Sequence, residues 1–247
     1  MGQKTVLVTG ANGAIGQALC GEFKGAGWRV IASDQDEEAA FSVDDYISIE
    51  LKRFCNDFEY QKKVGSMLLM ELPDNNLDAL INNAAVQVIA PVEELTMEDW
   101  TSTLDINLTA PFFLIKTLLS NLQKSKGSVI NIASIHAGLT KPNFTAYATS
   151  KAALVGLTRS LAVELGSRVR VNAICPAAIS TPMLKSGVDG SSQGLAKLAS
   201  FHPSGCIGLP EDVAELALYL AASNIKFLNG AVIGLDGGIT SRIHDPF

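Results

Sequence analysis

The chain has 247 residues, of which 47% are hydrophobic and 18% charged, and its formal net charge at pH 7 is −6. This composition excludes a disordered protein, and the negative charge without any block of Lys or Arg argues against a nucleic-acid partner. No apolar run is long enough to cross a membrane, and the first strand is expected directly after residues 1–4, with no room for a signal peptide. We therefore expect a cytoplasmic, globular protein in which residues 1–247 form a single domain.

The four cysteines lack the spacing of a metal site or a redox motif. Cys20, Cys55, Cys175 and Cys206 stand far apart in the sequence, and no histidine cluster accompanies them. We therefore expect reduced, mostly buried thiols, and we expect no metal site.

A glycine-rich turn follows the first expected strand, residues 4–9. Its sequence is Gly10-Ala11-Asn12-Gly13-Ala14-Ile15-Gly16, and a helical pattern begins at once over residues 14–24. Dinucleotide-binding loops have this context, because glycines let the backbone approach a pyrophosphate and the helix N-terminus supplies amide donors. The alternative is a structural turn that binds no ligand.

An acidic residue ends the second expected strand, residues 29–33. Asp34 stands at the position where a carboxylate accepts the adenosine ribose hydroxyls of a dinucleotide and repels a 2′-phosphate. No Arg or Lys stands in the glycine-rich turn or beside Asp34. This pattern favours NAD over NADP as the cofactor. The alternative role for Asp34 is that of a helix N-cap.

Strand and helix patterns alternate along the rest of the chain. Only residues 35–45 separate Asp34 from the next strand, so the second helix is expected to be no more than a turn or two. Further strands are expected over residues 46–49, 77–81, 128–132, 168–174 and 231–235, and helices over residues 53–71, from 97 with Thr96 as N-cap, then 107–122, 147–166 and 210–222. About seven parallel strands with helices on both faces predict an α/β, doubly wound Rossmann fold.

Three further segments are expected to border the site. Asn82-Asn83-Ala84-Ala85 follows a strand and offers amides and small side chains that can lie along a cofactor. Asn107 lies in an apolar helical region, where it either caps a bend or forms hydrogen bonds in the core. Residues 183–208 are rich in Gly and Ser, which is typical of a mobile lid over a substrate.

Tyr147 and Lys151 stand one helical turn apart in a segment whose apolar residues recur at helical spacing. The phenol and the ammonium therefore share one face of the helix. A nearby cation lowers the pKa of a tyrosine from about 10 toward the neutral range. Ser134 follows the expected strand 128–132, at the sheet edge where open α/β folds bind ligands. The alternative is a Tyr–Lys pair that occurs by chance.

These motifs, in this order, resemble those of the short-chain dehydrogenase/reductase family over essentially the whole chain. The matching pieces are residues 9–16, Asp34, 82–84, Asn107, Ser134, 147–151, Pro176, 179–181, 210–214 and 236–238. The resemblance implies that Tyr147 is the general acid/base and that Lys151 lowers its pKa and binds the nicotinamide ribose. It also implies that Ser134 holds the substrate oxygen and that Asn107 anchors a water in a proton relay. The cofactor-binding residues that it implies are Gly10, Asn12, Gly13, Ala14, Ile15, Gly16, Asp34, Asn83, Ala84, Ala85, Tyr147, Lys151, Pro176, Ile179 and Thr181.

Several positions depart from the family pattern. Ala14 stands where the family usually has glycine, and the spacing of Gly10, Gly13 and Gly16 resembles the extended branch, which includes nucleotide-sugar epimerases. The chain length and the spacing from serine to tyrosine fit the short branch instead. Ala85 and Ala177 also replace usual glycines, and their methyl groups are expected to reduce the affinity for the cofactor.

The substrate pocket is expected to include Gln87 and His136, together with Ser134 and Tyr147. The Gln87–His136 pairing resembles that of the 3-hydroxybutyrate dehydrogenases, in which polar side chains hold a small carboxylate. A lysine of those enzymes is replaced here by Phe144. A surface or packing role is the alternative for His136.

The residues and the resemblance together predict an NAD-dependent oxidoreductase that interconverts a secondary alcohol and a ketone. The expected substrate is small and polar, namely a hydroxy acid, a polyol or a sugar derivative. The alternatives are an NAD-dependent sugar epimerase or dehydratase, and a catalytically idle NAD-binding regulator. The resemblance also implies a homo-oligomer, either a dimer or a tetramer, with the mostly apolar faces of residues 111–122 and 152–165 available to pair subunits.

Overall fold

The centre of the molecule is a parallel sheet, seen in a computed structural model that describes residues 2–182, 184 and 192–243. Seven strands lie in the order β3-β2-β1-β4-β5-β6-β7, and every neighbouring pair is parallel. The predicted doubly wound α/β fold is confirmed. The strands are β1 (Thr5–Thr9), β2 (Arg29–Asp34), β3 (Asp45–Ser48), β4 (Ala79–Asn82), β5 (Ser128–Ile132), β6 (Arg170–Pro176) and β7 (Val232–Leu235).

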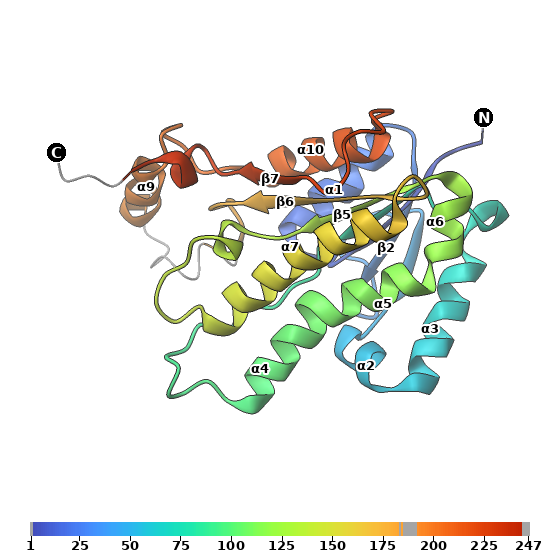
Figure 1. Ribbon diagram of the computed structural model, residues 1–247, viewed down its shortest axis with the longest axis horizontal. Helices are drawn as coiled ribbons and strands as arrows, with labels where there is room; N and C mark the ends of the chain where they lie inside the picture. The colour runs from blue at the N-terminus through green and yellow to red at the C-terminus, as the bar shows by residue number, and fades with distance from the viewer. Residues whose placement is uncertain (1, 183, 185–191, 244–247) are drawn as a thin grey trace.

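Helices cover both faces of this sheet (Figure 1). One layer consists of α1 (Ala14–Gly25) and α10 (Pro210–Ala222), and the other is built mainly from α3 (Phe58–Met70), α5 (Ala110–Thr117) and α7 (Thr145–Leu165). Successive strand residues point to opposite faces, so Val6 and Val8 pack under α1 and α10 while Leu7 packs under the other layer. Such strands are buried on both sides, which explains their almost unbroken apolar sequences.

The connection between β2 and β3 contains no helix. Residues 35–44 form bends, so the predicted turn or two of helix is wrong. The physical reason is that side chains from elsewhere bind this segment. The carbonyl oxygen of the Asn12 side chain accepts a hydrogen bond from the Ala40 amide at 2.8 Å, and its amide group donates to the carbonyl oxygen of Glu38 at 3.1 Å.

The helix predicted over residues 53–71 is two helices, α2 (Leu51–Asn56) and α3. Asp57 lies between them with extended backbone angles, φ −120° and ψ 106°, and its carboxylate accepts a hydrogen bond from the Tyr60 amide at 3.0 Å. An Asp that caps the second helix thus ends the first one. Because of this break, α2 can direct the side chains of Lys52 and Asn56 toward the helical segment that follows β4.

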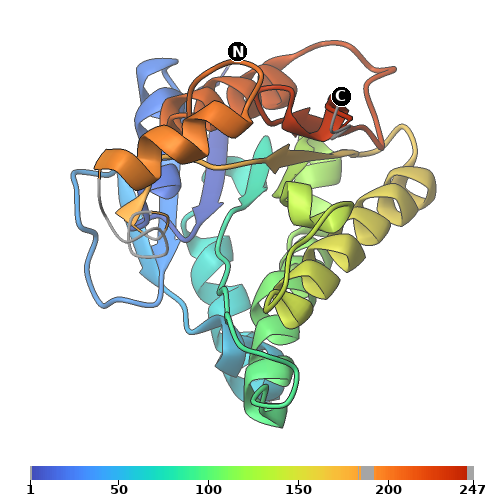
Figure 2. The same cartoon turned by 90° about the vertical axis from the view of Figure 1, so that its left-hand side faces the viewer.

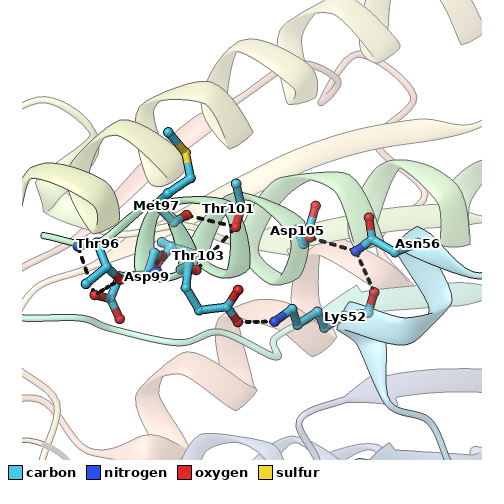
Figure 3. A network of polar contacts seen from close by, with 9 residues as sticks. Lys52, Asn56, Thr96, Met97, Asp99, Thr101, Thr103 and Asp105 are labelled. Atoms are coloured by element: carbon cyan, nitrogen blue, oxygen red, sulfur yellow. Dashed lines mark hydrogen bonds and ion pairs between the residues drawn. The ribbon is translucent and has the colours of Figure 1, made fainter.

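That helix, α4 (Met97–Leu104), begins with the predicted Thr96 cap. The Thr96 hydroxyl accepts from the Asp99 amide at 3.0 Å, and the Asp99 carboxylate accepts from the Thr96 amide at 3.1 Å. Figure 3 shows Lys52 and Asn56 of α2 extending toward α4 and its C-terminal continuation. Lys52 pairs with Glu98, and the Asn56 amide donates to Asp105 at 2.8 Å.

A π-helical segment, Asp105–Thr109, joins α4 to α5, and α6 (Leu119–Ser125) follows. The single helix predicted over residues 107–122 is therefore interrupted twice, by the π-helical segment at its start and by the break between α5 and α6. A π-helical turn contains one more residue than an α-helical turn, and such turns are frequent at functional sites. In the chain as described, α9 (Ser192–Phe201) is the helix that precedes α10 (Figure 2).

The cysteines are free thiols, as predicted, but they are not mostly buried. Cys20 and Cys175 are buried, Cys55 is half-buried, and Cys206 is exposed in the turn before α10. Across the described ranges, none of the helices combines the length and the apolar character that crossing a membrane requires.

Candidate active site

A cleft of about 1810 Å³ opens at the carboxyl ends of the strands. Its walls include Thr9 at the end of β1, Asp34 at the end of β2 and Pro176 at the end of β6. Every residue predicted for the cofactor and the substrate lines this cleft, and so do Ser134, Tyr147 and Lys151. Asn107 is the exception among the predicted residues, since it is buried behind the cleft wall.

The glycine-rich turn forms one wall of the cleft. Gly10 has a φ of +65°, and a Cβ there would lie 2.7 Å from the Ala84 Cα. A Cβ on Gly16 would lie 2.1 Å from the Gly10 carbonyl oxygen, so α1 can approach the turn only with glycine at this position. Gly13 differs, because a Cβ there would meet only the same oxygen, at 3.4 Å.

The turn is fixed to the segment that follows β4. The Asn83 side chain donates to the carbonyl oxygens of Thr9 at 2.9 Å and Gly10 at 3.0 Å. The backbone amides of Asn83 and Ala84 both donate to the Thr9 hydroxyl at 3.1 Å. These bonds hold two cleft walls from different parts of the chain at a fixed separation.

Asp34 lies half-buried at the end of β2, next to the turn. Its carboxylate accepts hydrogen bonds from the backbone amides of Asn12 at 2.9 Å and Gln35 at 2.7 Å. Asp36 and Glu50 line the same end of the cleft, so this end is acidic. Lys52, which the sequence reasoning missed, also lines it, but this lysine is paired with Glu98.

Asn107 is held inside the π-helical segment and is 1% exposed. Its side-chain oxygen accepts from the Val86 amide at 2.8 Å, and its side-chain nitrogen donates to the Val86 carbonyl at 2.9 Å and to the Ser150 hydroxyl at 3.0 Å. Of the two possibilities raised for this residue, hydrogen bonding in the core is therefore the one observed. The bonds fix the cleft wall at Val86 to α7.

Tyr147, Ser134 and Lys151 converge on the cleft. The Lys151 ammonium lies 5.6 Å from the centre of the Tyr147 ring and donates to the Ile132 carbonyl oxygen at 2.8 Å. Burial lowers the pKa of Lys151 to about 8, because the ammonium is removed from water. Burial also raises the pKa of Tyr147, although a hydrogen bond with the Ser134 hydroxyl opposes this effect.

The predicted lowering of the pKa of Tyr147 is therefore not observed in the protein alone. Burial of the phenol outweighs the opposing hydrogen bond with the Ser134 hydroxyl, so the pKa of Tyr147 is raised. The arrangement nevertheless brings a phenol, a hydroxyl and a cation to one point of the cleft. A group that must give up or accept a proton there has a hydrogen-bonding serine and an ammonium as its neighbours.

Aromatic rings form the substrate side of the cleft beyond Tyr147. The His136 ring stacks on the Phe144 ring with centroids 4.5 Å apart, and it meets the Tyr147 ring edge-on at 5.8 Å. The His136 Nδ1 lies 2.9 Å from the Thr140 hydroxyl oxygen. Burial and the charge of Lys141 lower the pKa of His136, so its neutral form is favoured. Gln87 lines the same part of the cleft.

The structure adds cleft residues that the sequence reasoning missed, namely Lys141, Arg242 and the ring of Phe144 in its stacked position. Lys141 could have been found, since it lies between Ser134 and Tyr147 and both ends of that segment border the site. Of the predicted lid, residues 183 and 185–191 lie outside the described residues, and α9 occupies part of the rest. Leu198 and His202 from this region line the cleft, and His202 is buried.

A parallel sheet of this order, a glycine-rich turn at its first strand and a Tyr–Lys pair beside a serine define a dinucleotide-dependent oxidoreductase. Residues 10–240 match a family model described as enoyl-(acyl carrier protein) reductase. The chain belongs to the short-chain dehydrogenase/reductase family, whose members use NAD or NADP.

Two curated relatives match nearly the whole chain. The 3beta-hydroxysteroid dehydrogenase 1 of Eggerthella lenta is 31% identical, with 96% of this chain and 94% of the relative covered. The D-threitol dehydrogenase of Mycolicibacterium smegmatis is 33% identical, with 97% and 94% covered.

Solved structures are similar over the same length. The aldohexose dehydrogenase of Thermoplasma acidophilum has a TM-score of 0.90 at 28% identity, with 99% of this chain and 97% of that chain covered. A 4-hydroxyisoleucine dehydrogenase complexed with NADH has a TM-score of 0.87 at 30% identity, with 98% and 100% covered. A putative gluconate 5-dehydrogenase from Beutenbergia cavernae with bound NADP has a TM-score of 0.85 at 29% identity, with 97% of each chain covered.

Proposed function

We propose that the protein is an NAD-dependent oxidoreductase that interconverts a secondary alcohol and a ketone on a small polar substrate. The observation that carries this proposal is the convergence of Tyr147, Ser134 and Lys151 in one cleft that also contains Asp34 at its other end. Among the relatives named above, the D-threitol and aldohexose dehydrogenases support a small hydroxylated substrate, whereas the 3beta-hydroxysteroid dehydrogenase is named for a large apolar alcohol.

The cofactor end of the cleft fits a dinucleotide. The turn leaves no room for side chains at Gly10 and Gly16, and no capping side chain occupies the N-terminus of α1 at Gly13. The pyrophosphate would lie against this turn and the residues Asn12, Gly13, Ala14, Ile15 and Gly16.

The choice between NAD and NADP rests on charge. Asp34 would accept the adenosine ribose hydroxyls, and Asp36 and Glu50 add negative charge at the same end of the cleft. A 2′-phosphate would be repelled there, because like charges in close proximity are unfavourable. The similar structures contain NADH in one case and NADP in another, so this preference depends on the residues of the present chain.

The remaining predicted residues would contact the nicotinamide half. Asn83, Ala84 and Ala85 would lie along the cofactor on one wall, and Pro176, Ile179 and Thr181 on the other. The bound nicotinamide supplies the position that accepts or releases a hydride.

Within this arrangement each catalytic side chain has one task. Tyr147 would take the proton from the substrate hydroxyl in oxidation and return it in reduction. Ser134 would donate a hydrogen bond to the substrate oxygen as negative charge develops. Lys151 would hold the nicotinamide ribose and favour the phenolate through its charge. Asn107 would fix the Val86 wall and, as the family resemblance implies, hold a water for proton release.

The test follows nicotinamide absorbance with NAD and with NADP against a panel of hydroxy acids, polyols and sugar alcohols. We expect turnover with NAD, and we expect Tyr147→Phe to lower kcat by about a hundredfold or more, which is the usual contribution of general acid–base catalysis. NADH binding should persist in the variant, since Tyr147→Phe removes only one hydroxyl.

Turnover that survives unchanged in Tyr147→Phe would contradict the proposed role of the phenol. Turnover with NADP alone would contradict the proposal that Asp34 binds the adenosine ribose and repels a 2′-phosphate. An unchanged redox state of the cofactor during conversion of a sugar would support the epimerase alternative, and NADH binding without any conversion would support the regulator alternative.

A further inference from the structure

The charges along the cleft are unevenly distributed. The acidic residues that line it, Asp34, Asp36 and Glu50, are all at the end proposed for adenosine, where Lys52 is paired with Glu98. Lys141 lies on the substrate side with His136 and Phe144, and no described Asp or Glu lines that part of the cleft. A cleft whose walls carry one sign of charge concentrates ligands of the other sign.

Lys141 is placed at this end by an ordered loop. Asn143 adopts a left-handed conformation with φ +72°, which turns the chain between Lys141 and α7. The Asn143 carbonyl oxygen then accepts a hydrogen bond from the Ala90 amide at 3.1 Å. This bond connects the loop to the cleft wall that contains Gln87. The loop therefore places Lys141 on the substrate side of the cleft.

Three ring contacts lead from Lys141 to the proposed acid/base. The Lys141 ammonium lies 4.7 Å from the centre of the Phe144 ring. Phe144 stacks on His136, and His136 meets Tyr147 edge-on. A cation over an aromatic ring is attracted to it but remains available to an anion, because the ring neutralises no charge. Lys141 therefore lies on the same side of the cleft as the proposed acid/base, with the Phe144 and His136 rings between it and Tyr147.

The charge of Lys141 reaches the interior of the site. It is one of the two causes that lower the pKa of His136, together with burial of that ring. Within the described ranges, no carboxylate forms an ion pair with Lys141. His136 is then a neutral hydrogen-bonding group beside a cation that has no counter-ion. This is the environment that a carboxylate ligand completes.

We propose that the substrate carries a carboxylate, and that Lys141 binds it while the alcohol carbon lies at Tyr147. The neutral His136 and Gln87, which line the same side of the cleft, supply hydrogen bonds. The substrate class is thus a short hydroxy acid or its keto acid, rather than a polyol. This inference rests on the proposed dehydrogenase function.

The reaction leaves the carboxylate unchanged. In the oxidation direction, the carbinol carbon loses its hydrogen as a hydride to NAD⁺, and the hydroxyl proton passes to Tyr147 and then to water. The carbon–oxygen double bond forms as the C–H and O–H bonds break, so one hydroxy acid and one NAD⁺ give one keto acid, one NADH and one proton. Lys141 takes no part in these steps and determines which substrate is bound.

The test uses pairs of alcohols that differ in a carboxylate, namely threonate with threitol, gluconate with glucitol, and 3-hydroxybutanoate with butane-1,3-diol. We expect the best acid to exceed its neutral counterpart in kcat/KM by roughly tenfold or more, the size expected of a partly screened charge-assisted hydrogen bond. Lys141→Met should remove this preference by raising KM for the acid. It should leave kcat, and the kinetics with the neutral alcohol, within about twofold, since the catalytic groups are untouched.

Two matched variants complete the experiment. Lys141→Arg keeps the charge and should restore most of the preference. Lys63→Met removes the same charge from the exposed face of α3 and should change nothing. As a measurement that does not depend on turnover, succinate is titrated into the NADH complex and followed by NADH fluorescence. We expect Lys141→Met to weaken succinate binding by roughly tenfold, on the same physical grounds.

The outcomes separate the two claims. Equal kcat/KM for the acids and their neutral counterparts, or equal succinate binding in the Lys141→Met and parent proteins, would overturn the inference and leave the dehydrogenase function standing. Failure of the protein to bind NADH would overturn the proposed function, and the inference with it.

Discussion

Burial of the Lys151 ammonium should make the protein less stable than it would be with an apolar residue at that position. The side chain is 2% exposed and has a single hydrogen-bond acceptor, the Ile132 carbonyl oxygen at 2.8 Å. An ammonium with one protein acceptor has lost most of its hydration. We therefore expect Lys151→Met, which keeps an unbranched side chain without the charged terminal atom, to inactivate the enzyme and stabilise the fold.

The size of the effect follows from the pKa. Burial lowers the pKa of Lys151 from 10.5 to about 8, and each pKa unit is worth about 1.4 kcal/mol. The folded state therefore bears a penalty of about 3 kcal/mol wherever this lysine is charged in both states. Lys151→Met removes that penalty but leaves the Ile132 carbonyl without its donor, which costs about 1 kcal/mol. The net gain in the free energy of unfolding at pH 7 is then about 2 kcal/mol.

The gain should depend on pH in a defined direction. Below about 8 the ammonium is charged in both the folded and the unfolded chain, so the penalty is complete. As the pH rises from about 8 toward 10.5 the folded lysine becomes neutral first, and the penalty disappears. Parent stability should therefore rise relative to the variant over this range.

The assay is urea unfolding, followed by circular dichroism, of the parent protein, Lys151→Met and the exposed-residue control Lys63→Met. The measurements are made at pH 7 and at about pH 10, which lie on either side of the folded pKa. We expect Lys151→Met to be more stable than the parent at pH 7 and about equal to it at the higher pH. A variant that is less stable at pH 7, or a difference that does not change with pH, would refute the reasoning.

Two further predictions concern the turn and the assembly. Gly16→Ala should destabilise the protein by about 2 kcal/mol or more in urea unfolding, because its Cβ would lie 2.1 Å from the Gly10 carbonyl oxygen, whereas Gly13→Ala should cost less than about 1 kcal/mol. Equal losses of unfolding free energy in the two variants would contradict this prediction, because they would show that the turn shifts to accommodate either side chain. Phe112 of α5 and Val163 of α7 are 40% and 85% exposed, and we expect these faces to pair copies of the chain. Light scattering should give a dimer or tetramer mass, and a monomer mass would exclude this.

The sheet and the cofactor turn could be predicted because their signals are local. Buried parallel strands are short apolar runs, and β5 was predicted at the residues where it is found. The glycines that the turn requires are visible in the sequence, although the difference between Gly13 and Gly16 is not. That difference depends on how closely α1 approaches the Gly10 carbonyl, and this distance is a property of the packed structure.

The parts that could not be predicted depend on bonds between distant segments. The residues around Asp57 have an ordinary helical sequence, and only the hydrogen bond from the Tyr60 amide to the Asp57 carboxylate shows that a new helix begins there. Asn107 was recognised as unusual, but its partner Val86 lies in a segment of no regular structure. Lys141 is an exposed lysine in a loop and has no pattern of its own, so the one signal for it in the sequence is its place between Ser134 and Tyr147. Its position matters only because Phe144 and His136 stack beneath it.

The connection between β2 and β3 shows how such bonds replace a missing element. A helix would satisfy its own backbone groups, and residues 35–44 are too few for a helix that spans the sheet. Asn12 of the glycine-rich turn supplies bonds instead, through its side chain to Asp36, Glu38 and Ala40, while its backbone amide binds Asp34. Asn12 consequently connects the acidic segment to the proposed cofactor turn. The shape of the end of the cleft proposed for adenosine therefore depends on the conformation of this connection.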